Sequence, residues 1–192
     1  IQLFFKTNKK EMKTLIIHPT DASTNFLRPI YKNVTNSTLI TGDITKAELF
    51  ELAQNHDRIM MMGHGSPKGL FAVSQFPDEG HMTYIVDHSF VPALKNKDNI
   101  FIWCHANKFV EKHQLNGFYS GMFISEFLEA VMYDYDVEEE IINESNDRFS
   151  EIVSAHANKP GEIIYKNVIE LFGELAERNP IARFNFERIS KS

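Results

Sequence analysis

Cysteine is nearly absent from this sequence: Cys104 is the single one among 192 residues. One thiol cannot form a disulfide within the chain, so a small extracellular fold held together by disulfides is excluded. Zinc sites that need two or more cysteines are excluded for the same reason. We therefore expect a protein of a reducing compartment, with the cytoplasm as its location.

Long hydrophobic runs and an excess of positive charge are also missing. No apolar stretch approaches the ~20 residues that a membrane-spanning helix needs, and no segment has the order of a signal peptide. The formal net charge is −6, whereas nucleic-acid-binding domains present a basic surface. We expect neither a membrane nor a nucleic acid as a partner, and the composition gives no indication of the oligomeric state.

The residues that are present indicate one folded domain. Hydrophobic residues make up 43% of the chain and include sixteen Phe, which is enough for an aromatic-rich core in a chain of this length. There is no internal repeat, low-complexity tract or Gly/Ser linker. The predicted domain covers residues 12–192, and residues 1–11, which precede Met12, are predicted to be an upstream or added segment outside the fold.

Apolar runs alternate with helical patterns along the chain. Strands are predicted at 13–18, 37–41, 58–62, 99–103 and 117–124, a small hairpin at 70–73 and 83–86, and a last strand at 181–189. Thr45 and Glu48 form a capping box that starts a helix. Further helices are predicted at 126–133, 137–155 and 161–177. This order predicts an α/β fold with a mainly parallel sheet and a helical C-terminal part.

Two of the predicted strands end in reactive side chains. Residues 58–62 lead into Gly63-His64-Gly65, and residues 99–103 lead into Cys104. Functional residues of open α/β sheets collect at the carboxyl ends of the strands, so the imidazole and the thiol could meet there. Such a pair can perform nucleophilic catalysis, with a thiolate that attacks and an imidazole that moves a proton. The backbone N–H groups of Gly65 and Cys104 are candidate donors to an oxyanion.

The two strand ends resemble those of the caspase-like (clan CD) cysteine peptidases, the group that holds gingipains, clostripain, legumains, separases and metacaspases. The similar stretches are IMMMGHG, which contains His64, and IFIWCHA, which contains Cys104. The resemblance covers about residues 13–133. It implies a three-layer αβα sandwich and a peptidase that cleaves proteins or peptides without a metal or other cofactor. It also implies His64 as the proton shuttle, Cys104 as the nucleophile and Gly65 N–H as an oxyanion donor.

The sequence departs from the better-known branches of that group. Caspases have Gln-Ala before the cysteine and Arg-Gly after it, whereas Cys104 lies between Trp103 and His105. Metacaspases have an Asp two positions before the cysteine, where this chain has Ile102. The substrate specificity of neither branch can therefore be transferred to this chain.

The same resemblance indicates where a substrate side chain would bind. The candidate residues are Asp21, after the first predicted strand, and Tyr119 and Ser120, in the fifth. Asp21 would suit a basic substrate side chain. The other interpretation of Asp21 is a turn residue or a helix cap without contact to substrate.

Two other functions stay open at this point. One is a catalytically inactive caspase-like module that binds a protein partner or regulates one. The other is a flavodoxin-like binding domain in which Cys104 is structural. The phosphate-binding turn of such a domain would need glycine, and residues 18–25 (HPTDASTN) contain none.

The acidic run 134–140 fits a solvated loop and a helix start, or a processing loop. A zinc site at Cys104 and His105 is disfavoured because adjacent strand residues point in opposite directions.

Overall fold

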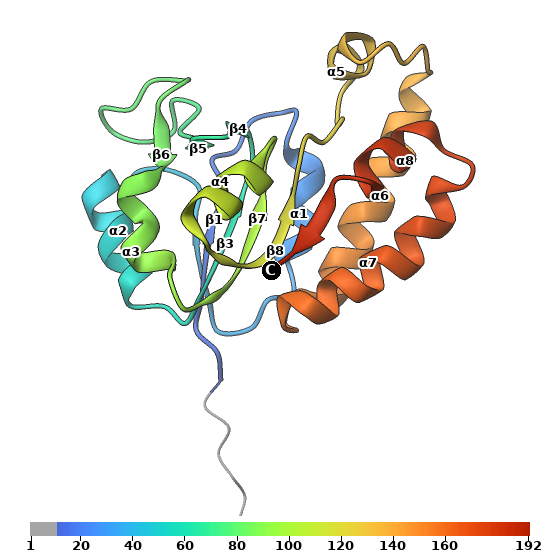
Figure 1. The fold of residues 1–192 in the computed structure, drawn as a ribbon. Coiled ribbons are helices and arrows are strands. Elements are labelled where there is room, and N and C mark those ends of the chain that lie inside the picture. Colours follow the sequence, from blue (N-terminus) through green and yellow to red (C-terminus); the bar gives the residue numbers. More distant parts are fainter. Residues whose placement is uncertain (1–10) are drawn as a thin grey trace, which may run out of the picture.

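The structure, a computed structural model, describes residues 11–192. Its main sheet has the strand order β2-β1-β3-β7-β8-β9 (Figure 1). These strands are β1 (Thr14–Ile17), β2 (Ser37–Ile40), β3 (Arg58–Met62), β7 (Asp98–Ile102), β8 (Asn116–Ser120) and β9 (Ile189–Lys191). All neighbouring pairs are parallel except β8 and β9. The predicted α/β class with a mainly parallel sheet is confirmed.

Helices cover both faces of the sheet, so the chain forms three layers (Figure 1). One face carries α2 (Lys46–Gln54), α3 (Val91–Leu94) and α4 (Ala106–His113). The other face carries α1 (Arg28–Tyr31), α6 (Glu139–His156), α7 (Gly161–Ala176) and α8 (Pro180–Phe186). Strand residues alternate between the two layers: Leu15 and Ile17 pack toward the first set of helices, and Ile16 packs toward the second. Because both faces of such a parallel strand are buried, its sequence is a continuous run of apolar residues.

The central strands β3 and β7 set the position of the residues that follow them. Every residue of β3 is buried, and Met62 lies opposite Ile102 in the register. Gly63 N extends the ladder by donating to Ile102 O at 3.0 Å. Because each paired residue of β7 lies forty positions after its partner in β3, His64 and Cys104 leave the sheet at neighbouring places on the same edge.

Other predicted elements are also found. The capping box starts α2, where Thr45 Oγ1 accepts from Glu48 N and Glu48 Oε2 accepts from Thr45 N. The predicted hairpin is part of a small antiparallel sheet made of β4 (Gly65–Ser66), β5 (Gly69–Phe71) and β6 (Tyr84–Val86). The prediction for residues 1–11 falls mainly on residues 1–10, which lie outside the described part of the chain.

One strand prediction extends too far, and another is wrong. The strand predicted at 117–124 ends at Ser120, and the chain continues as a connection to the short helix α5 (Phe127–Met132). The segment 181–189 is mostly helix α8, with β9 beginning only at Ile189. Pro180 is at the first helical position, where proline is favourable, and Asn179 caps the helix through Ala182 N at 2.8 Å. The buried residues of 181–186 then fit one helix face.

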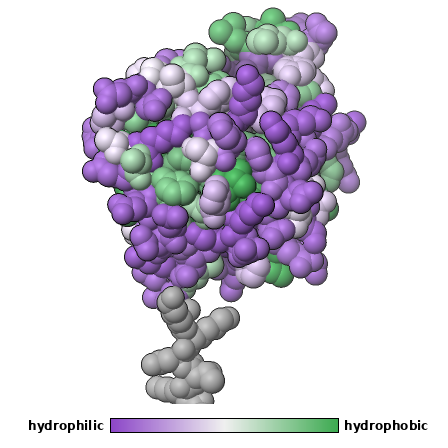
Figure 2. Space-filling view, turned by 60° about the vertical axis from the view of Figure 1, so that its left-hand side comes forward, coloured by the Kyte–Doolittle hydropathy of each residue, from purple (hydrophilic) through white to green (hydrophobic). Residues whose placement is uncertain are grey.

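Helix α5 differs from the other helices because it projects from the body of the protein (Figure 1). Only Ala130 of its six residues is buried. Figure 2 shows hydrophobic residues gathered at the top of the molecule, where Figure 1 places α5. The exposed large apolar side chains of this region are Phe127, Leu128, Val131, Met132 and Tyr133.

A buried arginine ties the amino end of the sheet to the C-terminal helices. The side chain of Arg58 is 1% exposed and pairs with the Asp98 carboxylate. It also donates to the carbonyls of Asp98, Ala157 and Lys159 at 2.7–3.1 Å. A buried guanidinium is tolerated only when its donors are satisfied in this way.

Among the helices of residues 11–192, none combines the length and the apolar character that crossing a bilayer requires.

Candidate active site at the ends of β3 and β7

Two glycines shape the chain around His64. Gly63 has φ +137°, a conformation that glycine adopts readily and other residues rarely, and it turns the chain out of β3. Gly65 lies so close to the Trp103 indole that a Cβ there would collide with the ring. Trp103 Nε1 also donates to Ser66 O at 3.1 Å. The segment after β3 is therefore packed directly onto the segment after β7.

The loop after β1 supplies a carboxylate that is held from several sides. Asp21 Oδ1 accepts from Ser23 N at 3.0 Å, from Ser23 Oγ at 2.7 Å and from Thr24 N at 3.2 Å. Burial alone would raise the pKa of Asp21, but these hydrogen bonds and the nearby His64 lower it overall. Asp21 is therefore an ionised group with a fixed orientation.

Asp21 and Ser23 together orient the His64 ring. Nε2 lies 3.0 Å from Asp21 Oδ2 and 2.7 Å from Ser23 Oγ. An ionised carboxylate can only accept, and the Ser23 hydroxyl already donates to Asp21, so both oxygens accept from Nε2–H. In the neutral ring the proton is then on Nε2, and Nδ1 carries the lone pair. This is the tautomer in which Nδ1 can act as a base.

Cys104 follows β7 and is half-buried. Its Sγ lies 3.8 Å from Phe123 O and 3.9 Å from Glu129 Oε1, in contacts where the thiol donates. Burial first, and then the Glu129 carboxylate, raise the pKa of Cys104 to about 12. The thiol is thus held in its protonated form in this conformation, and a thiol reacts as a nucleophile only after it loses that proton.

Glu129 reaches the thiol from helix α5. Its Oε2 accepts from Ser125 N at 2.8 Å and from Ser125 Oγ at 3.1 Å, while Oε1 faces Cys104. Burial raises the pKa of Glu129, and the two hydrogen bonds from Ser125 act in the opposite direction. This carboxylate therefore lies between Ser125 and the only thiol of the chain.

His64 and Cys104 line one hollow at the carboxyl edge of the sheet. The hollow has a volume of about 20 Å³, which is space for about one water molecule. Its walls also include Thr24, Phe26, Ser120, Phe123 and Ser125. Within residues 11–192 no hydrogen bond joins His64 to Cys104. The two side chains share a cavity, but a peptide side chain does not fit into it in this conformation.

The other predicted site residues lie in different surroundings. Ser120 lines the hollow, although its hydroxyl donates to Trp103 O at 3.1 Å. Tyr119 points to the opposite face of β8 and lines a separate hollow beside His105, so the structure does not bring it together with His64. Gly65 is in β4, next to His64, and its close packing on Trp103 gives a structural reason for a glycine there.

Sequence reasoning missed three residues of the site. Ser23 had a local signal, because Asp-x-Ser in a loop favours a turn closed by side-chain hydrogen bonds. Glu129 had none, since it is brought to Cys104 only by the path of the chain after β8. His18, at the end of the first predicted strand, is fully buried and bonds to Tyr31 Oη at 3.0 Å and to Thr24 Oγ1, in the wall of the hollow, at 3.2 Å.

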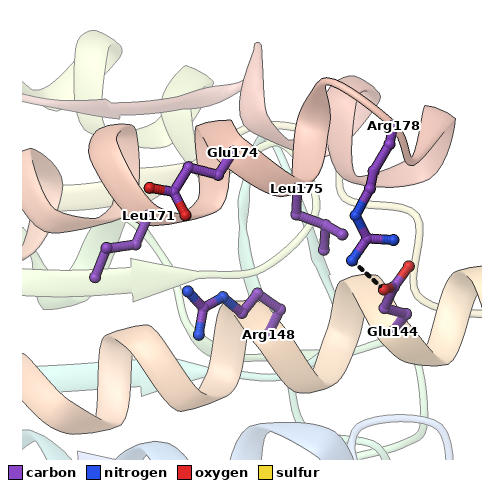
Figure 3. A pocket seen from close by; sticks show the side chains of 6 residues that line it. All are labelled: Glu144, Arg148, Leu171, Glu174, Leu175 and Arg178. Carbon is purple, nitrogen blue, oxygen red and sulfur yellow. Dashed lines mark hydrogen bonds and ion pairs between the residues drawn. The ribbon is translucent and has the colours of Figure 1, made fainter.

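Another hollow, of about 270 Å³, lies between α6 and α7 (Figure 3). Arg178 points into it toward Glu144 and pairs with that carboxylate at 2.6 Å. None of its lining residues belongs to the site at the sheet edge.

Across residues 11–192, no three His, Cys, Asp or Glu side chains form a group that could hold a metal ion.

Comparison with known proteins adds no assignment. A scan against models of protein families finds no match, and a search of curated proteins finds no similar sequence.

Proposed function

We propose that this chain is a caspase-like cysteine peptidase, with Cys104 as the nucleophile and His64 as the proton carrier. The observation that carries the proposal is the shared hollow: an imidazole fixed by Asp21 and the only thiol of the chain line it together. The three-layer arrangement agrees with the fold that the sequence resemblance implies. The substrate would be a protein or peptide, and the single cysteine fits a cytoplasmic setting.

The chemistry follows from the tautomer of His64. Nδ1 accepts the thiol proton, and the Cys104 thiolate attacks the carbonyl carbon of the scissile peptide bond. The carbonyl oxygen becomes an oxyanion, for which the N–H groups of Gly65 and Cys104 are the candidate donors. The C–N bond breaks as His64 returns the proton to the leaving amine. Water then hydrolyses the thioester, which releases the acid and restores the thiol.

Asp21 has a more specific role in this proposal than in the sequence prediction. Its carboxylate contacts Nε2 of His64, so it is engaged with the imidazole rather than open to a substrate side chain. A carboxylate in this position stabilises the imidazolium that forms when Nδ1 takes a proton. Asp21 is therefore proposed as a positioning residue.

A catalytically inactive module is the second candidate. The specific observations that favour it are the raised pKa of the Cys104 thiol and the small volume of the hollow. In that case the fold would serve as a protein-interaction or regulatory domain. Both candidates predict the same folded structure, and only the reactivity of the thiol toward peptides separates them.

The test uses peptide probes with a thiol-reactive carbonyl warhead and Arg, Lys, Asp, Asn or Leu at the anchor position. The wild type is compared with Cys104→Ala, His64→Ala and Asp21→Asn, and His81→Ala serves as the control because His81 is exposed and outside the site. Cys104→Ala should abolish labelling. His64→Ala should slow it by about 10²–10⁴-fold, Asp21→Asn should slow it by about tenfold or more, and His81→Ala should leave it unchanged.

The comparison with a simple alkylating agent decides between the candidates. Labelling by one anchor that is faster than alkylation by iodoacetamide, and that is lost in His64→Ala, supports the peptidase. If no probe labels Cys104 faster than iodoacetamide does, the inactive module is the better description. The anchor that labels fastest would also report the substrate preference.

A further inference from the structure

The connection that follows β8 passes over the hollow before it reaches α5. Phe123, early in this connection, is fixed in the core by stacking against Phe26 and by contact with Phe149. Ile124 is fixed by Asn185, which accepts from its N–H at 2.7 Å and donates to its carbonyl at 2.9 Å. Asn146 Nδ2 holds Ser125 O at 2.8 Å. The chain is therefore firmly anchored up to Ser125.

Beyond Ser125 the anchoring is much weaker. In α5 only Ala130 is buried, and just after the helix Tyr133 contacts Phe184 with 4.9 Å between ring centroids. Most of the large apolar side chains of α5 stay exposed, for example Leu128 at 69% and Met132 at 79%. A segment that buries so little surface can open locally without unfolding the rest of the domain.

The polar anchor of this weakly held helix is at the candidate nucleophile. Glu129 Oε2 accepts two hydrogen bonds from Ser125, and Oε1 accepts from the Cys104 thiol. The carboxylate thus fills space next to the sulfur and places a negative charge where a thiolate would form. The hollow, with a volume of about 20 Å³, is lined by Cys104 and by Ser125, the two residues that Glu129 contacts.

We propose that α5 is a lid that keeps Cys104 in a resting state through the Glu129 carboxylate, and that the site opens when α5 swings away about Ser125 and Glu126. Opening removes the acceptor from the thiol and enlarges the hollow, so a substrate can reach Cys104. The lid regulates the site of the proposed function and rests on that function for its biological role. Its physical effect on the thiol can be measured without any substrate.

Because the chain has one cysteine, iodoacetamide reports on Cys104 alone. The test measures the alkylation rate at pH 8 for the wild type and for Glu129→Gln. Glutamine keeps the length of the side chain and can still accept from Ser125, but it carries no charge and its amide can donate to a thiolate. The rate should rise by about tenfold or more, since a carboxylate near 4 Å from a forming thiolate lowers the thiolate population at least that much.

Asp134→Asn is the matched control. Asp134 is exposed and lies just after α5, and it has a positive φ that asparagine also tolerates. This variant removes one negative charge near the lid but no contact with the thiol, so its alkylation rate should stay within about twofold of the wild type. If Glu129→Gln is no faster than Asp134→Asn, the lid proposal is overturned.

Hydrogen exchange gives an independent measurement of the opening. In Glu129→Ala, which loses both hydrogen bonds from Ser125, the amides of α5 should exchange faster while those of α6 keep their protection. Unchanged exchange in α5 would count against the lid. Preserved protection in α6 shows that the variant is folded.

The two proposals fail in different ways. If Glu129→Gln is alkylated faster but no peptide probe labels the protein, the lid proposal stands and the peptidase proposal is overturned. If a peptide probe labels the wild type and Glu129→Gln changes neither alkylation nor labelling, the peptidase proposal stands and the lid proposal is overturned.

Discussion

His18 allows a sharp test of the structure through the pH dependence of stability. The ring is fully buried beneath the candidate site, between Tyr31 and Thr24. Burial first, and then the charge of Arg28, lower the pKa of His18 to about 4 from an ordinary value of 6.5. The folded protein therefore keeps this imidazole neutral at a pH where the unfolded chain protonates it.

The sign and size of the effect follow from that difference. The unfolded state binds more protons below pH 6.5, so the free energy of unfolding falls as the pH drops and the loss levels off below about pH 4. A tenfold change in proton affinity is worth about 1.4 kcal/mol. Between pH 7.5 and pH 4.5, His18 should lower the free energy of unfolding by about 2.5 kcal/mol.

Urea unfolding at the two pH values measures this loss in the wild type and in His18→Gln. Glutamine can donate to and accept from the neighbouring hydroxyls, but it does not titrate. Because the two proteins share every other titrating group, the difference between their losses reports on His18 alone. The wild type should lose about 2.5 kcal/mol more than the variant. Losses that agree within about 0.5 kcal/mol would show that His18 is not a buried neutral imidazole.

Two further predictions concern the thiol and the buried arginine. With a pKa of about 12, Cys104 of the folded wild type should be alkylated about tenfold faster for each pH unit from 7 to 10. The urea-unfolded chain should instead level off between about pH 9 and pH 10, because a free thiol has a pKa of ~8.5. The same levelling off in the folded protein would contradict the raised pKa. Arg58→Met takes the donor away from three carbonyls and leaves the Asp98 carboxylate with Gly161 N as its remaining donor. Urea unfolding should therefore show a loss of about 3–5 kcal/mol in the free energy of unfolding. Arg148→Met, the control, removes only an exposed pair and should cost under about 1 kcal/mol; equal losses would mean that the burial of Arg58 contributes nothing.

The sheet and the place of the two candidate residues were predictable because they depend on short apolar runs. Strands β3 and β7 are covered on both faces, so each carries an unbroken apolar run: 59–62, which ends at Gly63, and 100–102, which Trp103 continues up to Cys104. Parallel strands deliver their ends to one edge, and the forty-residue separation of His64 and Cys104 equals the offset of the strand register. The alternation of strands and helices then predicted the layers.

The remaining features depend on contacts between distant segments. The alternation at 181–189 resembles a strand, but Pro180 and the Asn179 cap favour a helix, and packing against α6 and α7 decides the outcome. Glu129 is an ordinary helical glutamate in the sequence, and only the path of the chain after Ser120 brings it to the thiol. For Tyr119 the strand was predicted correctly, but its face depends on a register that the sequence does not reveal.

The packing of Gly65 on Trp103 links the two halves of the candidate site in evolutionary terms. One residue directly follows the candidate base and the other directly precedes the candidate nucleophile, and they fill a single space. A side chain at 65 would collide with the Trp103 ring and also with the Gly69 carbonyl, so a change at 65 requires both the segment after β7 and the start of β5 to move. Selection would act on the two strand ends as one inherited unit, even though forty residues separate them along the chain.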